Sequence, residues 1–103
     1  MSVPFHSRIS AFGSLTWSDD PALTGVERFE PGRYLLEFRH DVADSALLVA
    51  PLAFAEDGHP LLATARFRNN RQLEIRVFDA FDPAALKNAE ISCQRISRPS
   101  LGH

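Results

Sequence analysis

The stretch Gly32–Leu52, GRYLLEFRHDVADSALLVAPL, has the densest hydrophobic pattern in the chain, and it decides the predicted fold. In its first part Tyr34, Leu36 and Phe38 share one phase and charged residues dominate the other, which is the period-2 pattern of a half-buried strand. From residue 45 to residue 54 the chain is almost continuously apolar, which predicts a strand buried on both faces. A short acidic turn joins these two predicted strands.

The residues on either side predict further strands and the turns that connect them. Pro31 and Gly32 fit the central positions of a type II turn, because Pro presets the first φ and Gly tolerates a positive second φ. Farther along, the alternating segments 61–68 and 72–77 flank the turn residues 69–71. Two alternating segments around a short turn predict a β-hairpin.

These signals repeat along the chain and predict an all-β, antiparallel β-sandwich of jelly-roll-like type with about seven short strands. Pro51 lacks an N–H and is expected at a strand end, an edge or a bulge. At most one helical turn is expected, near residues 82–87, where Asp82 suits an N-cap and Pro83 the first helical position. The predicted organisation is a flexible N-terminus, one β-sandwich domain and a flexible C-terminal tail, at residues 1–7, 8–97 and 98–103.

Composition and charge limit the class of partner. The chain has 103 residues, enough for one domain, and a formal charge of −2, which argues against nonspecific nucleic-acid binding. The charge is uneven, because residues 19–57 carry nine acids and three arginines, whereas residues 66–76 carry four arginines and one glutamate. These two groups either are ordinary surface scatter or form patches that pair between copies or hold an anion.

Cysteine usage and the N-terminal residues bear on the compartment. Cys93 is the only cysteine, so an intrachain disulfide is excluded, as is usual in a reducing compartment. The N-terminal residues lack the pattern of a signal peptide, and no apolar run approaches the roughly 20 residues of a membrane span. We expect a cytoplasmic protein, or a component of a virion or injection assembly, without membrane insertion.

The order of several weak motifs resembles a small bacterial all-β module known from uncharacterised proteins. That module has a Gly-x-Tyr-x-x-x-Phe strand, an Asp-Val turn, a buried Ala-rich strand, an Asn-containing hairpin and a last strand ending in Cys. The matching positions are Gly32, Tyr34, Phe38, Asp41, Val42, Ala50, Asn70, Ile75, Val77, Asp79 and Cys93.

The module is also broadly similar to the jelly-roll heads of phage tail fibres and to C1q-like domains, which implies a homo-oligomer and favours a trimer. The chain departs from the module at Ser45, where the family often has a cysteine. This departure leaves Cys93 without its implied partner. Function does not follow from a shared fold, so the resemblance implies no activity.

Two residue sets are candidates for binding. A cluster of cationic and amide side chains on the predicted hairpin suits a carboxylate or phosphate, although cross-strand pairing with Glu74 is the plainer explanation. This predicted ligand-binding set is Arg66, Arg68, Asn70, Arg71 and Arg76. Apolar residues on the phase opposite the predicted core suggest an oligomer interface, unless bulges shift them into the core. This predicted interface set is Leu35, Leu47, Val49, Leu62 and Phe78.

No assembled catalytic or metal-binding motif is found in the sequence. The groups His40, Asp41, Asp44 and Glu56, Asp57, His59 are typical of solvated turns, where Asp side chains bond local N–H groups. Cys93 falls on the apolar phase of its strand, where a free cysteine acts as a small hydrophobic residue. We therefore expect no enzyme activity, no metal and no cofactor.

These observations favour a non-enzymatic structural or interaction module, a self-associating β-sandwich that presents loops to a protein or glycan partner. The alternative is a small carbohydrate- or anion-binding module that uses the Arg66–Arg76 hairpin, together with Trp17 and Tyr34 as aromatic contacts.

Overall fold

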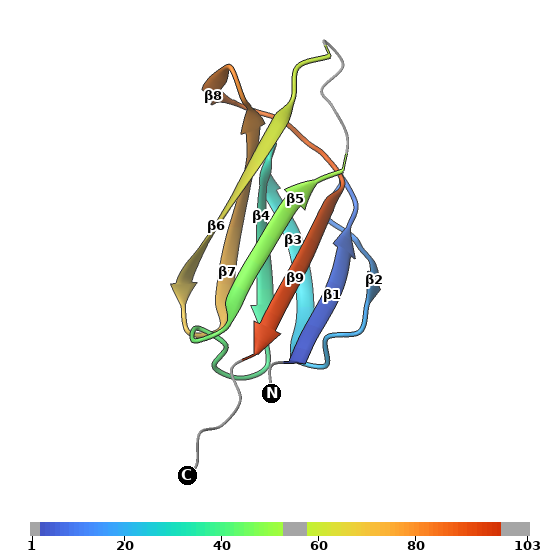
Figure 1. The fold of residues 1–103 in the computed structure, drawn as a ribbon, viewed down its shortest axis with the longest axis vertical. Coiled ribbons are helices and arrows are strands. Elements are labelled where there is room, and N and C mark those ends of the chain that lie inside the picture. Colours follow the sequence, from blue (N-terminus) through green and yellow to red (C-terminus); the bar gives the residue numbers. More distant parts are fainter. Residues whose placement is uncertain (1–2, 53–57, 98–103) are drawn as a thin grey trace.

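The computed structural model describes residues 3–52 and 58–97, which form nine β-strands in two antiparallel sheets and no helix (Figure 1). The first sheet has the strand order β2 (Leu15–Ser18), β1 (Val3–Ile9), β9 (Ile91–Ser97), β5 (Ala46–Pro51). The second sheet has the order β3 (Leu23–Glu30), β4 (Arg33–Phe38), β7 (Gln72–Asp79), β6 (Leu61–Asn69), and β8 (Asp82–Leu86) pairs with β7. The predicted all-β antiparallel sandwich is confirmed.

Two segments were not expected to be strands, and they account for the difference between seven strands and nine. Residues 1–7 were expected to be a flexible end, but β1 starts at Val3 and pairs with β9 along its whole length. Pro4, His6 and Arg8 dilute the apolar pattern of this strand. At most one helical turn was expected near residues 82–87, and the structure has a strand there instead, because 82–86 are extended as β8. Pairing with the end of β7 gives this segment hydrogen-bond partners that an isolated helical turn lacks.

The core lies between the sheets and follows the predicted alternation. Tyr34, Leu36 and Phe38 of β4 are all buried, and so are alternate residues of β7 and β9. The Tyr34 hydroxyl donates a hydrogen bond to the Ala11 carbonyl at 2.8 Å and accepts one from the Ala89 N–H at 3.3 Å. This fully buried ring therefore ties two loops to the core, and it is not available as the aromatic ligand contact predicted from the sequence.

Strand β5 differs from its prediction. Leu47 and Val49 point inward and pack against the core, whereas Leu48 on the other face is 59% exposed. The strand lies at the edge of the first sheet, beside β6 of the second, so only its inner face is covered. Pro51 is the last residue of this edge strand, as predicted, because a residue without an N–H fits an edge.

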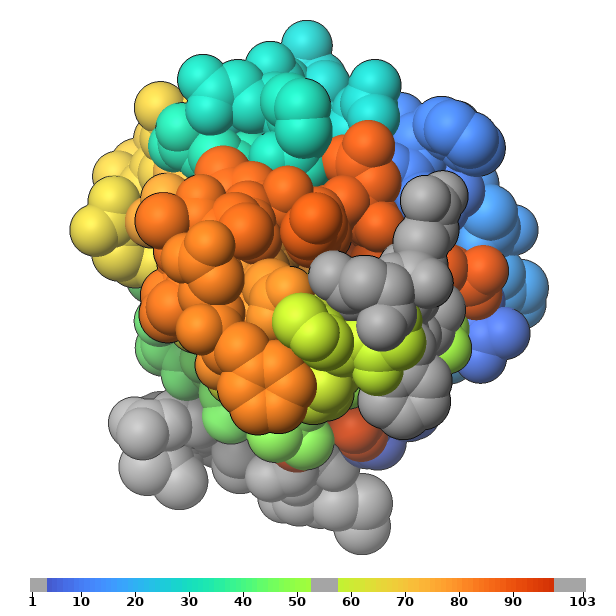
Figure 2. Space-filling view, turned by 90° about the horizontal axis from the view of Figure 1, so that it is seen from above, coloured from blue at the N-terminus to red at the C-terminus, as the bar shows by residue number. Residues whose placement is uncertain are grey.

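The turn between β3 and β4 has the predicted geometry. Gly32 has a φ of 73°, as the second central position of a type II turn requires. A Cβ at Gly32 would lie 2.7 Å from the backbone nitrogen of Lys87, so the position also requires the absence of a side chain. Figure 2 shows this end of the sandwich, where the turn lies against the connection from β8 to β9 and bonds Asn88.

The opposite end contains a buried ion pair. Arg95 of β9 donates two hydrogen bonds to the carboxylate of Asp20, at 2.8 and 2.9 Å, and a third to the Ser45 hydroxyl at 3.0 Å. Its guanidinium lies 4.9 Å from the centre of the Phe5 ring and 5.9 Å from that of Phe38. The pair joins the first sheet to the connection between β2 and β3.

Candidate functional site

Two of the five predicted ligand-binding residues lie together on the outer face of the second sheet. Arg66 of β6 and Arg76 of β7 are both exposed, and with Thr64, Ala65 and Glu74 they line a pocket of about 320 Å³. Within the described part of the chain, neither guanidinium has a hydrogen-bond or ion-pair partner. Two unpartnered guanidinium groups beside one pocket are able to bind carboxylate or phosphate oxygens.

The other three members of the predicted set do not line this pocket. Asn70 and Arg71 form the turn at the end of the β6–β7 hairpin, and the Arg71 Nε donates to the last carbonyl of β4 at 3.2 Å. Arg68 lies 4.0 Å from the Glu74 carboxylate, and its guanidinium is 5.7 Å from the centre of the Phe29 ring. Of the predicted set, therefore, only Arg66 and Arg76 line the pocket.

Between this pair and the β3 edge, the charges on the face neutralise one another. Arg33 donates two hydrogen bonds to the buried Glu74 carboxylate, at 3.0 and 2.9 Å, and one to Glu30 at 2.8 Å. The bonds to Glu30 and Glu74 raise the pKa of the Arg33 guanidinium. The same guanidinium lies 4.7 Å from the centre of the Phe29 ring. The plainer explanation, pairing with Glu74, therefore holds for Arg33 and Arg68 but not for Arg66 or Arg76.

Cross-strand register places four side chains in one row across this face. The row runs from Glu27 on β3 through Leu35 on β4 and Glu74 on β7 to Arg66 on β6. Its two ends are exposed and oppositely charged, and three strand spacings separate them by about 14 Å. Half-buried Leu35 lies between them, so the face has an acidic edge, an apolar contact and a basic edge.

The acidic edge is hollowed. A pocket of about 150 Å³ is lined by Gly25, Glu27, Leu35 and Glu37, together with Val26. No atom of another part of the chain lies within 4 Å of where a Gly25 Cβ would be, so the space above this residue is open. Two carboxylates therefore border a hollow at the β3–β4 edge, and two guanidiniums stand at the β6–β7 edge.

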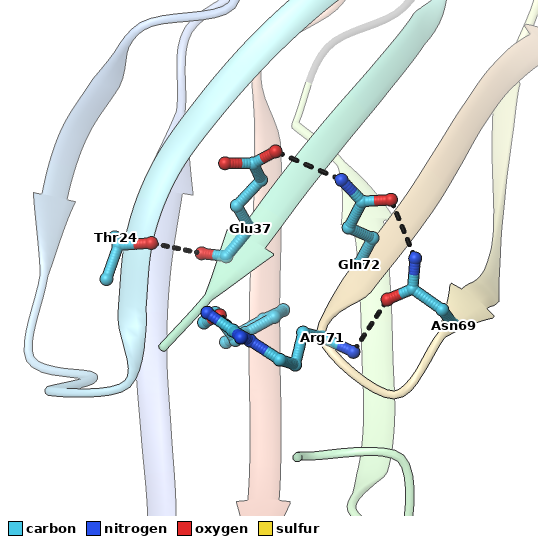
Figure 3. A pocket seen from close by; sticks show the side chains of 6 residues that line it. Thr24, Glu37, Asn69, Arg71 and Gln72 are labelled. Atoms are coloured by element: carbon cyan, nitrogen blue, oxygen red, sulfur yellow. Dashed lines mark hydrogen bonds between the residues drawn. The ribbon is translucent and has the colours of Figure 1, made fainter. Parts of the chain in front are cut away.

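A third pocket, of about 280 Å³, lies near the β6–β7 turn (Figure 3). Its side chains bond one another: Asn69 donates to Gln72 at 2.8 Å, and Gln72 donates to the Glu37 carboxylate at 3.0 Å. The Thr24 hydroxyl donates to the Glu37 backbone carbonyl at 3.1 Å. Because these groups already satisfy one another, this pocket has fewer free donors for a ligand than the Arg66–Arg76 pocket.

The structure places the five residues of the predicted interface set in two different environments. Leu35, Leu62 and Phe78 lie on the outer face of the second sheet, and Leu62 is opposite Phe78 in the register. Leu62 is 50% exposed, whereas Phe78 is half-buried. Leu47 and Val49 were predicted to lie on the phase opposite the core, and this phase is wrong, because edge strand β5 turns them inward. For these two residues the alternative explanation, a core position, holds.

The groups considered for catalysis do not assemble in the described part of the chain. His40 and Asp41 are exposed in a turn, where the Asp41 carboxylate accepts the Ala43 N–H at 3.0 Å. The Cys93 thiol is buried, and burial raises its pKa to about 12. In residues 3–52 and 58–97, no group of three His, Cys, Asp or Glu side chains is arranged to hold a metal ion.

The second predicted loop group is only partly described. Glu56 and Asp57 lie outside the described residues. His59 Nδ1 is 2.9 Å from a carboxylate oxygen of Asp79 on β7, and its ring meets Phe81 edge to face. The bond with His59 and the one from the Phe81 N–H lower the pKa of Asp79. This contact fastens the loop before β6 to the end of β7.

Comparison with protein-family models, curated proteins and solved structures gives no match to this chain. The resemblance to a bacterial all-β module and to tail-fibre heads therefore stays a prediction. Ser45, the position where that module often has a cysteine, bonds Arg95, whereas the cross-strand neighbour of Cys93 on β5 is Val49. In the ranges that the structure describes, there is no helix of the length and apolar character needed to cross a membrane.

Sequence reasoning missed two members of the charged face. Glu27 was counted only as part of an acidic stretch, and Gly25 was not singled out. The charge contrast between residues 19–57 and 66–76 was the available signal. This charge contrast could not be interpreted without the strand order, which places β3 and β6 at opposite edges of one sheet.

Proposed function

We propose that this chain is a non-enzymatic interaction module that self-associates face to face through the outer surface of its β3-β4-β7-β6 sheet. The observation that carries the proposal is that the basic and acidic side chains of this face, the split face, lie at opposite edges. Unpartnered Arg66 and Arg76 stand at one edge, and the hollow bordered by Glu27 and Glu37 lies at the other.

A two-fold axis makes such a face complementary to itself. An axis that runs parallel to the strands, between β4 and β7, places β3 of one copy over β6 of the other. Because Glu27 and Arg66 are the two ends of one row, each Glu27 then lies over the Arg66 of the second copy. An axis perpendicular to the strands would instead stack acidic edge on acidic edge, so charge favours the parallel axis.

Shape supports the same arrangement. The guanidinium of Arg66 from a second copy would enter the hollow above Gly25, where a side chain is absent and carboxylates are close. This contact would occur twice in the pair of copies. Charge-assisted bonds between guanidinium and carboxylate are among the stronger polar contacts in proteins.

The size of the face sets the expected affinity. Four strands about 4.8 Å apart, each with about six residues, cover roughly 400 Å² per copy. Stable interfaces bury about 800 Å² per partner. We therefore expect a salt-sensitive pair of copies with a dissociation constant in the micromolar range. The resemblance to tail-fibre heads favours a trimer, whereas the split face favours two copies, and the mass in solution separates the two.

The test is the mass of wild type and Arg66→Glu by light scattering at high micromolar concentration and low salt. Wild type should be a dimer that dissociates in about 1 M salt, where the screening length falls to about 3 Å. Arg66→Glu should be monomeric at every salt concentration, because it places a carboxylate over Glu27. Arg39→Glu is the matched control, since it makes the same charge change on an exposed residue beyond the end of β4. A wild-type monomer, or an undisturbed Arg66→Glu dimer, would overturn the proposal.

A second variant tests the contact without changing any charge. Gly25→Val should fold normally, because its Cβ meets open space and valine suits a strand. The valine would fill the hollow that receives Arg66, so the dimer should weaken. A Gly25→Val protein that dimerises as wild type does would show that the hollow is not used.

A second candidate function is binding of an anion, because Arg66 and Arg76 border a pocket with the Thr64 hydroxyl. A phosphate or carboxylate group there would accept hydrogen bonds from both guanidiniums. Inorganic phosphate should then raise the melting temperature of wild type but not of Arg66→Ala/Arg76→Ala, at matched ionic strength. Equal shifts in both proteins would exclude this site.

A further inference from the structure

The outer face of the first sheet carries a different group of side chains, centred on the only tryptophan of the chain, Trp17. Trp17 of β2 is 55% exposed, although a side chain of this size is usually largely buried. Register places Trp17 beside Arg8 of β1, and Arg8 beside Ser92 of β9. His6 lies two residues from Arg8 on the same exposed phase of β1.

These residues border a hollow in the sheet surface. A pocket of about 380 Å³ is lined by Trp17, His6, Arg8 and Ser92, together with Ser7. Volumes of about 300–1,000 Å³ are typical of small-molecule sites. Because β2 is an edge strand, the indole lies at the rim of the sheet, where a ligand longer than the pocket can extend past it.

The polar groups around the indole indicate the kind of ligand. Hydrogen-bonding side chains line the pocket beside Trp17, and the exposed Leu15 of the same strand is not among the lining residues. An apolar partner surface would desolvate the Arg8 and His6 side chains without giving them new hydrogen bonds, which is costly. A ligand with one apolar face and a polar rim fits this arrangement better.

The charges around the pocket further restrict the class of ligand. The Arg8 Nε lies 3.6 Å from the Glu90 carboxylate, so the positive charge beside the indole is balanced within the chain. On the other sheet, by contrast, the guanidiniums of Arg66 and Arg76 have no such partner in the described part of the chain. The Trp17 pocket therefore offers hydrogen bonds and an aromatic surface without an excess of either charge.

We infer that the pocket formed by Trp17, Arg8, His6 and Ser92 binds a neutral saccharide. The C–H face of a pyranose ring stacks on the indole, and the ring hydroxyls bond the polar side chains around it. An edge position allows neighbouring sugar units to continue past β2. This site lies on the opposite outer face from the proposed dimer contact, so its test does not depend on self-association.

The tryptophan itself is the probe for the test. Because the chain has one tryptophan, its fluorescence reports this pocket alone. The wild-type protein is titrated to millimolar concentrations with the β-1,4-linked tetrasaccharides of glucose, N-acetylglucosamine, xylose and mannose. At least one should change the emission saturably, with an affinity that about 1 M salt leaves within roughly twofold, because no net charge is involved.

Variants of the pocket residues and a control variant test whether the saccharide binds at Trp17. By calorimetry, Trp17→Ala should weaken binding about tenfold or abolish it, and Arg8→Ala should weaken it several-fold. Phe81→Ala, which removes an exposed aromatic ring from the β7–β8 turn, should bind as wild type does. Absence of a saturable change with all four saccharides, or binding that survives Trp17→Ala, would overturn the inference. A strong loss of affinity in salt would indicate an anionic ligand instead, and would also overturn it.

Discussion

Arg95 and Arg66 are both arginines on strands of the sandwich, but they differ in burial and in the partners of their guanidinium groups. Arg95 is buried, donates three hydrogen bonds to Asp20 and Ser45, and has an aromatic ring near its guanidinium on β1 and another on β4. Arg66 is exposed, and its guanidinium has no hydrogen-bond or ion-pair partner in the described part of the chain. The contrast teaches which charges hold the fold and which are available to another molecule.

The largest effect should come from breaking the buried pair. Arg95→Ala leaves the Asp20 carboxylate buried without its cation, and such losses cost about 3–5 kcal/mol of unfolding free energy. Denaturant unfolding measures this change. The matched control is Arg66→Ala, which should stay within about 0.5 kcal/mol of wild type because it removes no internal contact. Equal losses in the two variants would remove the distinction between the two arginines.

A pH titration sharpens the comparison. Burial raises the pKa of Asp20, but hydrogen bonds from Arg95 and the Ala22 N–H outweigh it, and the folded-state pKa is lowered overall. The stability that Asp20 contributes is therefore fully present above its unfolded pKa of about 3.9, and it is lost as the pH falls through the folded value.

Asp20→Asn should accordingly be less stable than wild type near neutral pH, and the difference should shrink as the pH falls below about 4. Denaturant midpoints measured across the acid range give this difference directly. A constant gap between the two proteins at every pH would show that the Asp20 charge does not stabilise the fold.

The smallest effect on folding is expected at the other end of the Arg66 row. Glu27→Gln keeps the shape of an exposed side chain and removes one charge, so the unfolding free energy should change by less than about 0.5 kcal/mol. Its self-association should nevertheless weaken measurably, because it deletes one charge from each of the two symmetric contacts. A stability loss with unchanged association would place Glu27 among the residues that hold the fold.

The sequence predicted the fold class well because the strands of the second sheet have clear period-2 patterns. Tyr34, Leu36 and Phe38 carry large side chains on a single phase, and burial of that phase needs no knowledge of its partner strand. Strands β1 and β8 were missed because polar and proline residues dilute their patterns. The extended conformation of β1 depends on pairing with β9, which is distant in sequence, and that of β8 on pairing with only the last residues of β7.

The candidate site was predictable only in part. Arg66 and Arg76 could be grouped because a hairpin brings nearby residues together. Glu27 and Arg66 could not be related, because they share a row only through the strand order β3-β4-β7-β6. The continuous apolar run of β5 could not show which face is covered, and in the structure Leu47 packs against the core whereas Leu48 is exposed.

The most direct test of the split face mixes two variants that cannot pair with themselves. Glu27→Arg/Glu37→Arg makes the face basic at both edges, and Arg66→Glu/Arg76→Glu makes it acidic at both edges. Each variant alone should be monomeric by light scattering, and the equimolar mixture at low salt should form a one-to-one dimer that dissociates in high salt. A mixture that stays monomeric, or a variant that dimerises alone, would contradict the proposal that this face joins two copies.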